Sequence, residues 1–143
     1  MTINRHVGSL FRMGDAWLTR RLKGIGISGS SAYMVLELST GGAISLKELS
    51  MRVGVDQAHT TRMVQLLENV GLVERARDPG DARSSIISIT EQGKHVALIA
   101  EKAILEWVAI VSDAVSPEDI KITSRTLTRF YENAIAGLAE SRS

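Results

Sequence analysis

Five polar side chains that suit contact with DNA lie close together in the chain: Gln57, His59, Thr61, Arg62 and Gln65. From the major groove an arginine can read guanine and a glutamine can read adenine, while a threonine hydroxyl can donate to a phosphate. The same side chains would also suit the solvent face of an amphipathic helix. We interpret Arg62 and Gln57 as DNA contacts, and His59 and Gln65 fit both interpretations equally well.

A second polar group follows: Arg75, Arg77, Asp81 and Arg83. An arginine near a hairpin tip can enter the minor groove, where the negative potential is strongest in narrow A·T tracts. We therefore interpret Arg83 as a DNA contact rather than a solvated charge. We expect Asp81 to brace the turn and to orient the Arg83 guanidinium through a charge-assisted bond. Arg75 and Arg77 alternate on one face of a strand, where they either contact phosphates or keep an edge strand soluble.

The elements that position these side chains begin with a short predicted helix over residues 46–53. Ser45 and Glu48 fit a capping box, in which the serine caps the helix and the glutamate caps in return. Gly54 supplies a left-handed residue after the helix. This spacing is typical of the first helix and turn of a helix–turn–helix.

The second helix of the pair begins at its cap, Asp56, and ends near Val70. Its apolar positions predict an inner side formed by Thr60, Met63, Val64, Leu67 and Val70. Two strands follow, over residues 73–77 and 84–89, joined by the turn-forming residues 78–82. A helix–turn–helix with a charged wing places one helix in the major groove and a loop beside it.

Helices predicted on both sides of this segment carry more apolar surface than it can cover. They extend over residues 5–23, from the cap Ser28 to Gly41-Gly42, over 91–113 and over 117–138, with a very short strand at 43–44. A helix that is apolar on more than one face is usually buried on more than one face. We therefore expect both ends of the chain to form a dimer interface. A symmetric dimer would present two recognition helices about 34 Å apart.

The composition narrows the remaining classes of protein. The 143 residues carry a net charge of +1 and no cysteine, which excludes disulfides and thiolate metal sites. No apolar run approaches the roughly 18 residues of a membrane span, and arginines interrupt the N-terminal segment, so we expect a cytoplasmic protein without a signal peptide. His6, His59 and His95 lack the spacing of a helical metal site. With no phosphate loop and no nucleophile motif, we expect neither an enzyme nor a cofactor.

The run LKELSMRVGVDQAHTTRMVQLLENVGLVERARDPGDARSSIISITEQGK resembles the winged-helix core of the MarR family of bacterial regulators. Four features carry the resemblance: the Thr61-Arg62 pair, the segment LLENVGLVER, the wing turn RDPGDAR with Asp81 and Arg83, and SITEQGK before a long helix. The segment LTRRLKGIGIS also resembles the end of the family's first helix. The resemblance therefore extends over nearly the whole chain.

The resemblance implies a homodimeric winged-helix repressor or activator that binds a short palindrome, often regulates its own gene, and is released by a small, often phenolic or aromatic ligand. In the family such effectors lodge between the dimer helices and the winged head. Trp17 and Tyr33, with Arg20 or Arg21 pairing an anionic ligand, would line such a pocket, although each also suits simple packing. Two departures stand out. Ala82 replaces a second arginine of many members, which lowers the expected affinity of the wing, and the lack of cysteine excludes the thiol-oxidation branch.

The sequence thus predicts a mainly α protein with a small β-wing, in which residues 1–143 form one MarR-like domain. Residues 28–90 form the winged helix–turn–helix, and residues 1–27 and 91–143 the helical dimerisation region. The expected partners are double-stranded DNA, a second copy of the chain and a small-molecule effector, with no membrane. The alternative is a winged-helix scaffold that binds protein partners without specific DNA binding.

Overall fold

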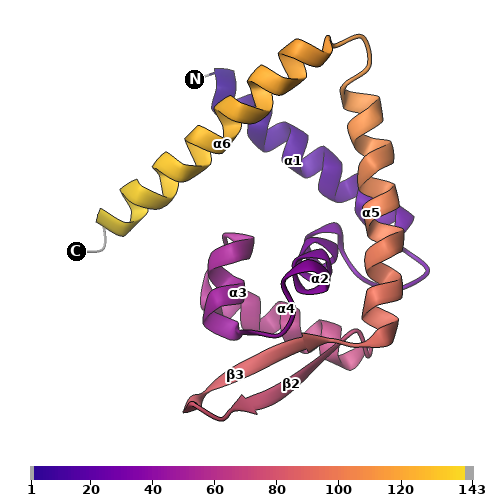
Figure 1. Ribbon diagram of the computed structural model, residues 1–143. Helices are drawn as coiled ribbons and strands as arrows, with labels where there is room; N and C mark the ends of the chain where they lie inside the picture. Colours follow the sequence, from indigo (N-terminus) through magenta and orange to yellow (C-terminus); the bar gives the residue numbers. More distant parts are fainter. Residues whose placement is uncertain (1, 141–143) are drawn as a thin grey trace. The chain divides into compact units, whose positions relative to one another are not determined.

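The computed structural model describes residues 2–140 and has a mainly helical fold with one small sheet (Figure 1). This confirms the predicted fold class. The elements are α1 (Thr2–Arg21), α2 (Gly29–Gly41), β1 (Ile44–Ser45), α3 (Leu46–Val53), α4 (Gln57–Asn69), β2 (Val73–Asp78), β3 (Asp81–Ile89), α5 (Glu91–Val111) and α6 (Pro117–Glu140). The chain divides into two compact units, one ending at Trp107 and the other beginning at Val108. In the described part, no helix is both long enough and apolar enough to span a membrane.

The three predicted N-caps of the winged segment are confirmed. The side chains of Ser28, Ser45 and Asp56 each accept a hydrogen bond from the amide three residues later, at 3.1, 3.1 and 2.8 Å. Gly54 has the predicted left-handed conformation, with φ 70° and ψ 26°. The capping box is only half formed, because the carboxylate of Glu48 pairs with Arg52 instead of returning to the cap. These caps fix where α2, α3 and α4 begin.

The core of the first unit lies where α2, α3, α4, the sheet and the first half of α5 meet. On α4 the buried side chains are Thr60, Met63, Val64 and Leu67, as predicted. The prediction for Val70 is wrong, because that side chain is 37% exposed. The helix ends at Asn69, and Val70 is its C-cap, with φ −96° and ψ 7°.

The sheet has the order β1–β3–β2 with antiparallel pairing throughout. Its short first strand pairs Ile44 with Ile87, one residue later than the predicted strand at 43–44. The wing turn is also tighter than predicted, because β3 already begins at Asp81. The Asp78 carboxylate accepts the amide of Gly80 at 2.8 Å and closes the turn locally. Arg83 therefore lies within a strand, two residues beyond its start.

The helices outside the winged segment leave much of their apolar surface uncovered within the chain. On α1, which begins earlier and ends earlier than predicted, only Gly14 and Leu18 are buried. Over residues 117–140, which form α6, no residue is buried. On α6 the leucine, isoleucine and aromatic side chains are 39–62% exposed, and on the N-terminal half of α1 the side chains of Ile3, Leu10 and Phe11 are 49–59% exposed.

Candidate nucleic-acid interface

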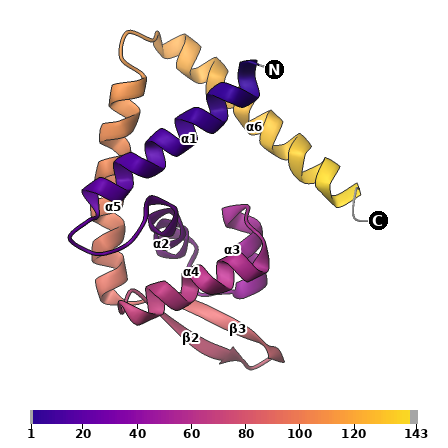
Figure 2. The same ribbon diagram turned by 180° about the vertical axis from the view of Figure 1, so that it is seen from behind.

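Helix α4 runs alongside the base of the β2–β3 hairpin (Figure 2). Its side opposite the buried residues Thr60, Met63, Val64 and Leu67 is directed away from the core. Because successive helical residues are about 100° apart, the middle of this outward face falls on Ala58, Arg62 and Gln65, all exposed. We call this surface, together with Thr61, Leu66 and Asn69, the recognition face. Gln57 and His59 lie on its two flanks, and the side chain of His59 is half-buried.

The polar side chains of the recognition face differ in how free they are. The Thr61 hydroxyl donates to the carbonyl of Gln57 at 2.8 Å, so its proton is not available to the phosphate that we expected it to contact. The amide of Gln65 donates to Asn69 at 3.0 Å. Arg62 is exposed and makes no hydrogen bond or ion pair with the described residues. It is therefore the side chain of this face best placed to bind an external acceptor.

The cap of α4 adds a carboxylate at the edge of this face. The amide of His59 donates to Asp56 and lowers the pKa of that carboxyl below its ordinary value, and Arg62 adds a smaller effect in the same direction. Asp56 thus stays ionised near neutral pH. Its charge lies close to the backbone amides of the first turn, where a helix favours a negative group.

Three residues of β2 share one face of the strand, and they become more exposed from the start of the strand toward its end. Val73 is buried, Arg75 is half-buried and Arg77 is exposed, which confirms the predicted alternation. The Arg75 guanidinium lies 3.5 Å from Glu68 of α4, and its Nε and Nη2 atoms are buried without a hydrogen-bond acceptor. Arg75 therefore links the wing to α4, which leaves Arg77 as the β2 arginine directed at solvent.

The expected role of Asp81 is only partly correct. Its carboxylate accepts the backbone amide of Arg83 at 2.9 Å, so it braces the start of β3. The bond is to the main chain and not to the Arg83 guanidinium, because the tight turn places that amide two residues away within reach of the carboxylate. The Arg83 side chain is exposed and has no ion pair among the described residues.

The comparisons with known proteins agree with this geometry. Residues 31–85 match the model of the MarR family. The chain is 30% identical over 108 residues to an uncharacterized HTH-type transcriptional regulator, YdgJ, of Bacillus subtilis, covering 76% of this chain and 66% of that protein. A MarR transcriptional regulator from Methanosarcina mazei has a TM-score of 0.88 at 25% identity, covering 94% of this chain and 97% of that one.

The chain belongs to the MarR family. It is also 36% identical over 90 residues to the organic hydroperoxide resistance transcriptional regulator of Bacillus subtilis, covering 62% of this chain and 59% of that protein. The matches thus span about three fifths to two thirds of these curated relatives. A mutant MarR from E. coli, complexed with operator DNA, shares the fold with a TM-score of 0.80 at 18% identity, over 91% of this chain and 94% of that one.

Two of the four expected effector residues of this MarR-family chain join α1 to α5. The Trp17 indole donates to the carbonyl of Ala103 at 3.0 Å, and the Arg21 guanidinium lies 4.4 Å from the centre of the Trp17 ring. Arg21 also pairs with Glu106 at 3.0 Å. These contacts are packing contacts, and they occupy the polar groups that we expected to meet a ligand.

The other two expected effector residues, Arg20 and Tyr33, take no part in these contacts between α1 and α5. Arg20 is exposed on α1. Tyr33 is 38% exposed on α2, and burial, with a smaller effect of the Asp15 carboxylate, raises the pKa of its phenol. None of the four residues lines either of the two pockets described in the structure.

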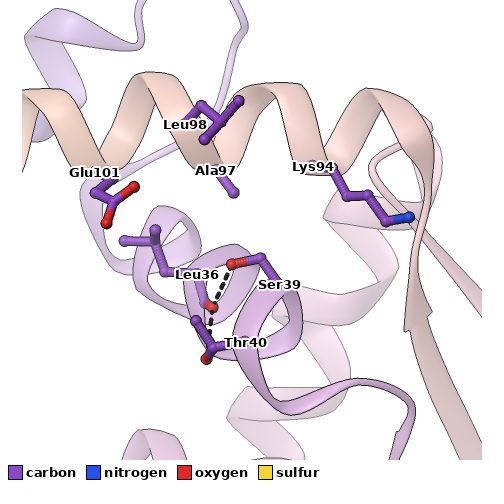
Figure 3. A pocket seen from close by; sticks show the side chains of 7 residues that line it. All are labelled: Leu36, Ser39, Thr40, Lys94, Ala97, Leu98 and Glu101. Atoms are coloured by element: carbon purple, nitrogen blue, oxygen red, sulfur yellow. Dashed lines mark hydrogen bonds between the residues drawn. The ribbon is translucent and has the colours of Figure 1, made fainter.

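A cavity of about 260 Å³ lies instead between α2 and α5 (Figure 3). Its lining is formed by Leu36, Ser39, Thr40, Lys94, Ala97, Leu98 and Glu101. The volume is slightly below the roughly 300–1,000 Å³ of common small-molecule pockets. The sequence did not reveal this cavity because its lining comes from two helices far apart in the chain, and nothing in either segment indicates that they face each other.

Proposed function

We propose that this protein is a sequence-specific, DNA-binding transcriptional regulator in which α4 enters the major groove and the β2–β3 wing contacts the flanking backbone. The observation that carries the proposal is the exposed Arg62 at the middle of the α4 face opposite the core, which makes no hydrogen bond or ion pair within the described part of the chain. The fold shared with an E. coli MarR complexed with operator DNA supports it.

Within this proposal the predicted site residues take different roles. Arg62, Gln57 and Gln65 contact bases, because they project from the front or flank of α4. Arg77 and Arg83 contact phosphates or the minor groove. The remaining residues act mainly by position: His59 and Thr61 support the first turns of α4, Arg75 ties the wing to α4, and Asp81 braces the turn.

We further propose that the protein acts as a homodimer on a palindromic operator. The uncovered apolar surface outside the winged segment supports this assembly. On α6, Ile120, Leu127, Tyr131 and Leu138 recur at spacings that place them on one stripe, and each is at least 39% exposed. In this division residues 28–90 bind DNA, and residues 1–27 and 91–143 form the dimer.

The proposal includes repression that is relieved by a small aromatic or anionic ligand. A ligand that binds one spacing of the two winged heads better than another would shift the population away from the spacing that fits the operator. Of the sites described above, the cavity between α2 and α5 is the better candidate, because Trp17 and Arg21 are already engaged in packing.

Fluorescence anisotropy with the purified protein tests the function. The DNA upstream of the protein's own gene and a scrambled duplex are titrated at two salt concentrations. We expect tight, salt-sensitive binding to the upstream DNA alone, and a loss of base preference in Arg62→Ala. If the protein binds both duplexes equally and weakly, a preferred sequence is sought by selection from random DNA. Failure of that selection as well would contradict the proposal and favour the alternative of a winged-helix scaffold for protein partners.

A further inference from the structure

The recognition face of α4, together with Gln57 on its flank, consists of two neighbouring rows of side chains with different chemistry. Residues four apart lie one above the other on a helix. One row is polar and contains Gln57, Thr61, Gln65 and Asn69. The other row contains Ala58, Arg62 and Leu66, so that a guanidinium lies between two apolar side chains.

The apolar members of the second row are uncovered within the chain. Leu66 is 61% exposed and Ala58 is also exposed, whereas the apolar side chains on the opposite side of α4 are at most 7% exposed. In the major groove, the apolar group that a protein can contact is the 5-methyl group of thymine. An apolar side chain next to a base-reading arginine therefore has a specific complement in DNA.

We propose that Ala58 and Leu66 determine sequence specificity by packing against the methyl groups of thymines on the two sides of the base that Arg62 reads. This inference rests on the proposed function. The eight residue steps from Ala58 to Leu66 rise by about 12 Å along the helix, which matches about four base pairs at 3.4 Å each. The expected half-site thus contains a guanine with a thymine on each side within that length.

The choice of DNA over a protein partner follows from the neighbouring row. Gln57 and Gln65 offer donors and acceptors of the kind that read base edges, at the same height as Ala58 and Leu66. Arg62 carries the only charge of the second row, and its guanidinium makes no hydrogen bond or ion pair with the described residues, although the Asp56 carboxylate lies near enough to interact with its charge. DNA supplies partners for all three kinds of group on one surface.

The experiment replaces thymine by uracil, which removes only the 5-methyl group, at each position of a half-site selected from random duplexes by the wild-type protein. Affinities are measured for the wild type and for Ala58→Gly, Leu66→Gln and Met51→Gln. Met51 of α3 is 62% exposed and serves as the matched control for Leu66. Melting curves verify that each variant is folded.

Burial of one methyl group contributes about 0.8 kcal/mol, which corresponds to a roughly fourfold change in affinity. For the wild type, we therefore expect uracil to weaken binding roughly fourfold at each of two positions. Ala58→Gly should become insensitive to uracil at one of these positions and Leu66→Gln at the other, while Met51→Gln behaves as the wild type. Measuring the affinity of each variant for both the thymine and the uracil duplex separates the contact between side chain and methyl group from any general loss of helix stability.

Three results would overturn the inference while leaving the proposed function intact. The first is that uracil at no position weakens binding by the wild type. The second is that Ala58→Gly and Leu66→Gln lose as much affinity on uracil substitution as the wild type does. The third is that Leu66→Gln changes the mass of the protein in solution, which would mark Leu66 as part of a protein interface. If selection enriches no sequence at all, the proposed function itself fails, and this inference fails with it.

Discussion

The arginines of the wing differ in their surroundings, and this difference predicts how each one affects binding to DNA. Arg77 and Arg83 are exposed and unpaired among the described residues, whereas Arg75 lies 3.5 Å from Glu68. We expect Arg77→Ala and Arg83→Ala each to remove a phosphate contact. Arg75→Met, which keeps the apolar stem packed against the core face of β2, should leave the number of phosphate contacts unchanged.

The magnitude follows from counterion release. Each phosphate contact contributes about 0.9 to the slope of log K against log salt concentration. A substitution that removes one such contact from each subunit of a homodimer therefore reduces the slope by about 1.8. When the salt concentration rises from 50 to 200 mM, both proteins lose affinity for DNA, but the loss for Arg77→Ala is about 12-fold smaller than the loss for the wild type. Arg75→Met would follow the wild-type line.

The assay is a titration of labelled operator DNA by anisotropy at five or more salt concentrations, with melting curves to verify folding. The reasoning is refuted if Arg75→Met reduces the slope as much as Arg77→Ala does. In that case the ion pair with Glu68 would open on DNA and Arg75 would bind phosphate directly. A slope that no wing variant changes would remove the wing from the interface altogether.

Other predictions concern stability and assembly. At Gly93 an added Cβ would meet the Leu72 carbonyl and lie 2.6 Å from Ile89, so Gly93→Ala should lower the free energy of unfolding in urea by about 1–3 kcal/mol; Gly24→Ala, which has open space, is the control, and equal effects would contradict the argument. Because the pKa of Asp56 is lowered in the folded state, its stabilisation is complete above the ordinary value of 3.8 and is lost as the pH falls through the lowered value. The melting temperatures of wild type and Asp56→Ala should therefore differ at pH 7 and converge in acid, and a gap that persists in acid would exclude an ionic cap. Leu127→Glu on the exposed stripe of α6 should shift sedimentation from dimer to monomer; an unchanged mass would place the interface elsewhere.

Local chemistry in the sequence was enough to predict most of the winged segment. Ser45, Asp56 and Gly54 each act within a few residues of their own position, because caps and turns depend on side chains bonding to nearby amides. The wing turn was predicted too long. Turn-forming residue types extend over 78–82, but the Asx bond from Asp78 and the strand pairing decide where the turn ends.

The candidate site, too, could be predicted from the sequence only in part. Periodicity alone located the exposed side of α4, including Arg62, and the alternation of Arg75 and Arg77 on β2. It did not indicate the roles that we propose for Ala58 and Leu66, because an apolar residue carries no signal of contact with DNA until the buried face of the helix is known.

The sequence by itself determined the element types, the starts of the capped helices α2, α3 and α4, and the winged helix–turn–helix order, since these depend on interactions between residues close together in the chain. Only the tertiary structure decided which charges are free. Arg75 meets Glu68, Arg21 meets Glu106 and Trp17 meets Ala103 because separate helices and strands bring them together. Such contacts depend on packing between elements, and the pattern of a single segment does not encode them.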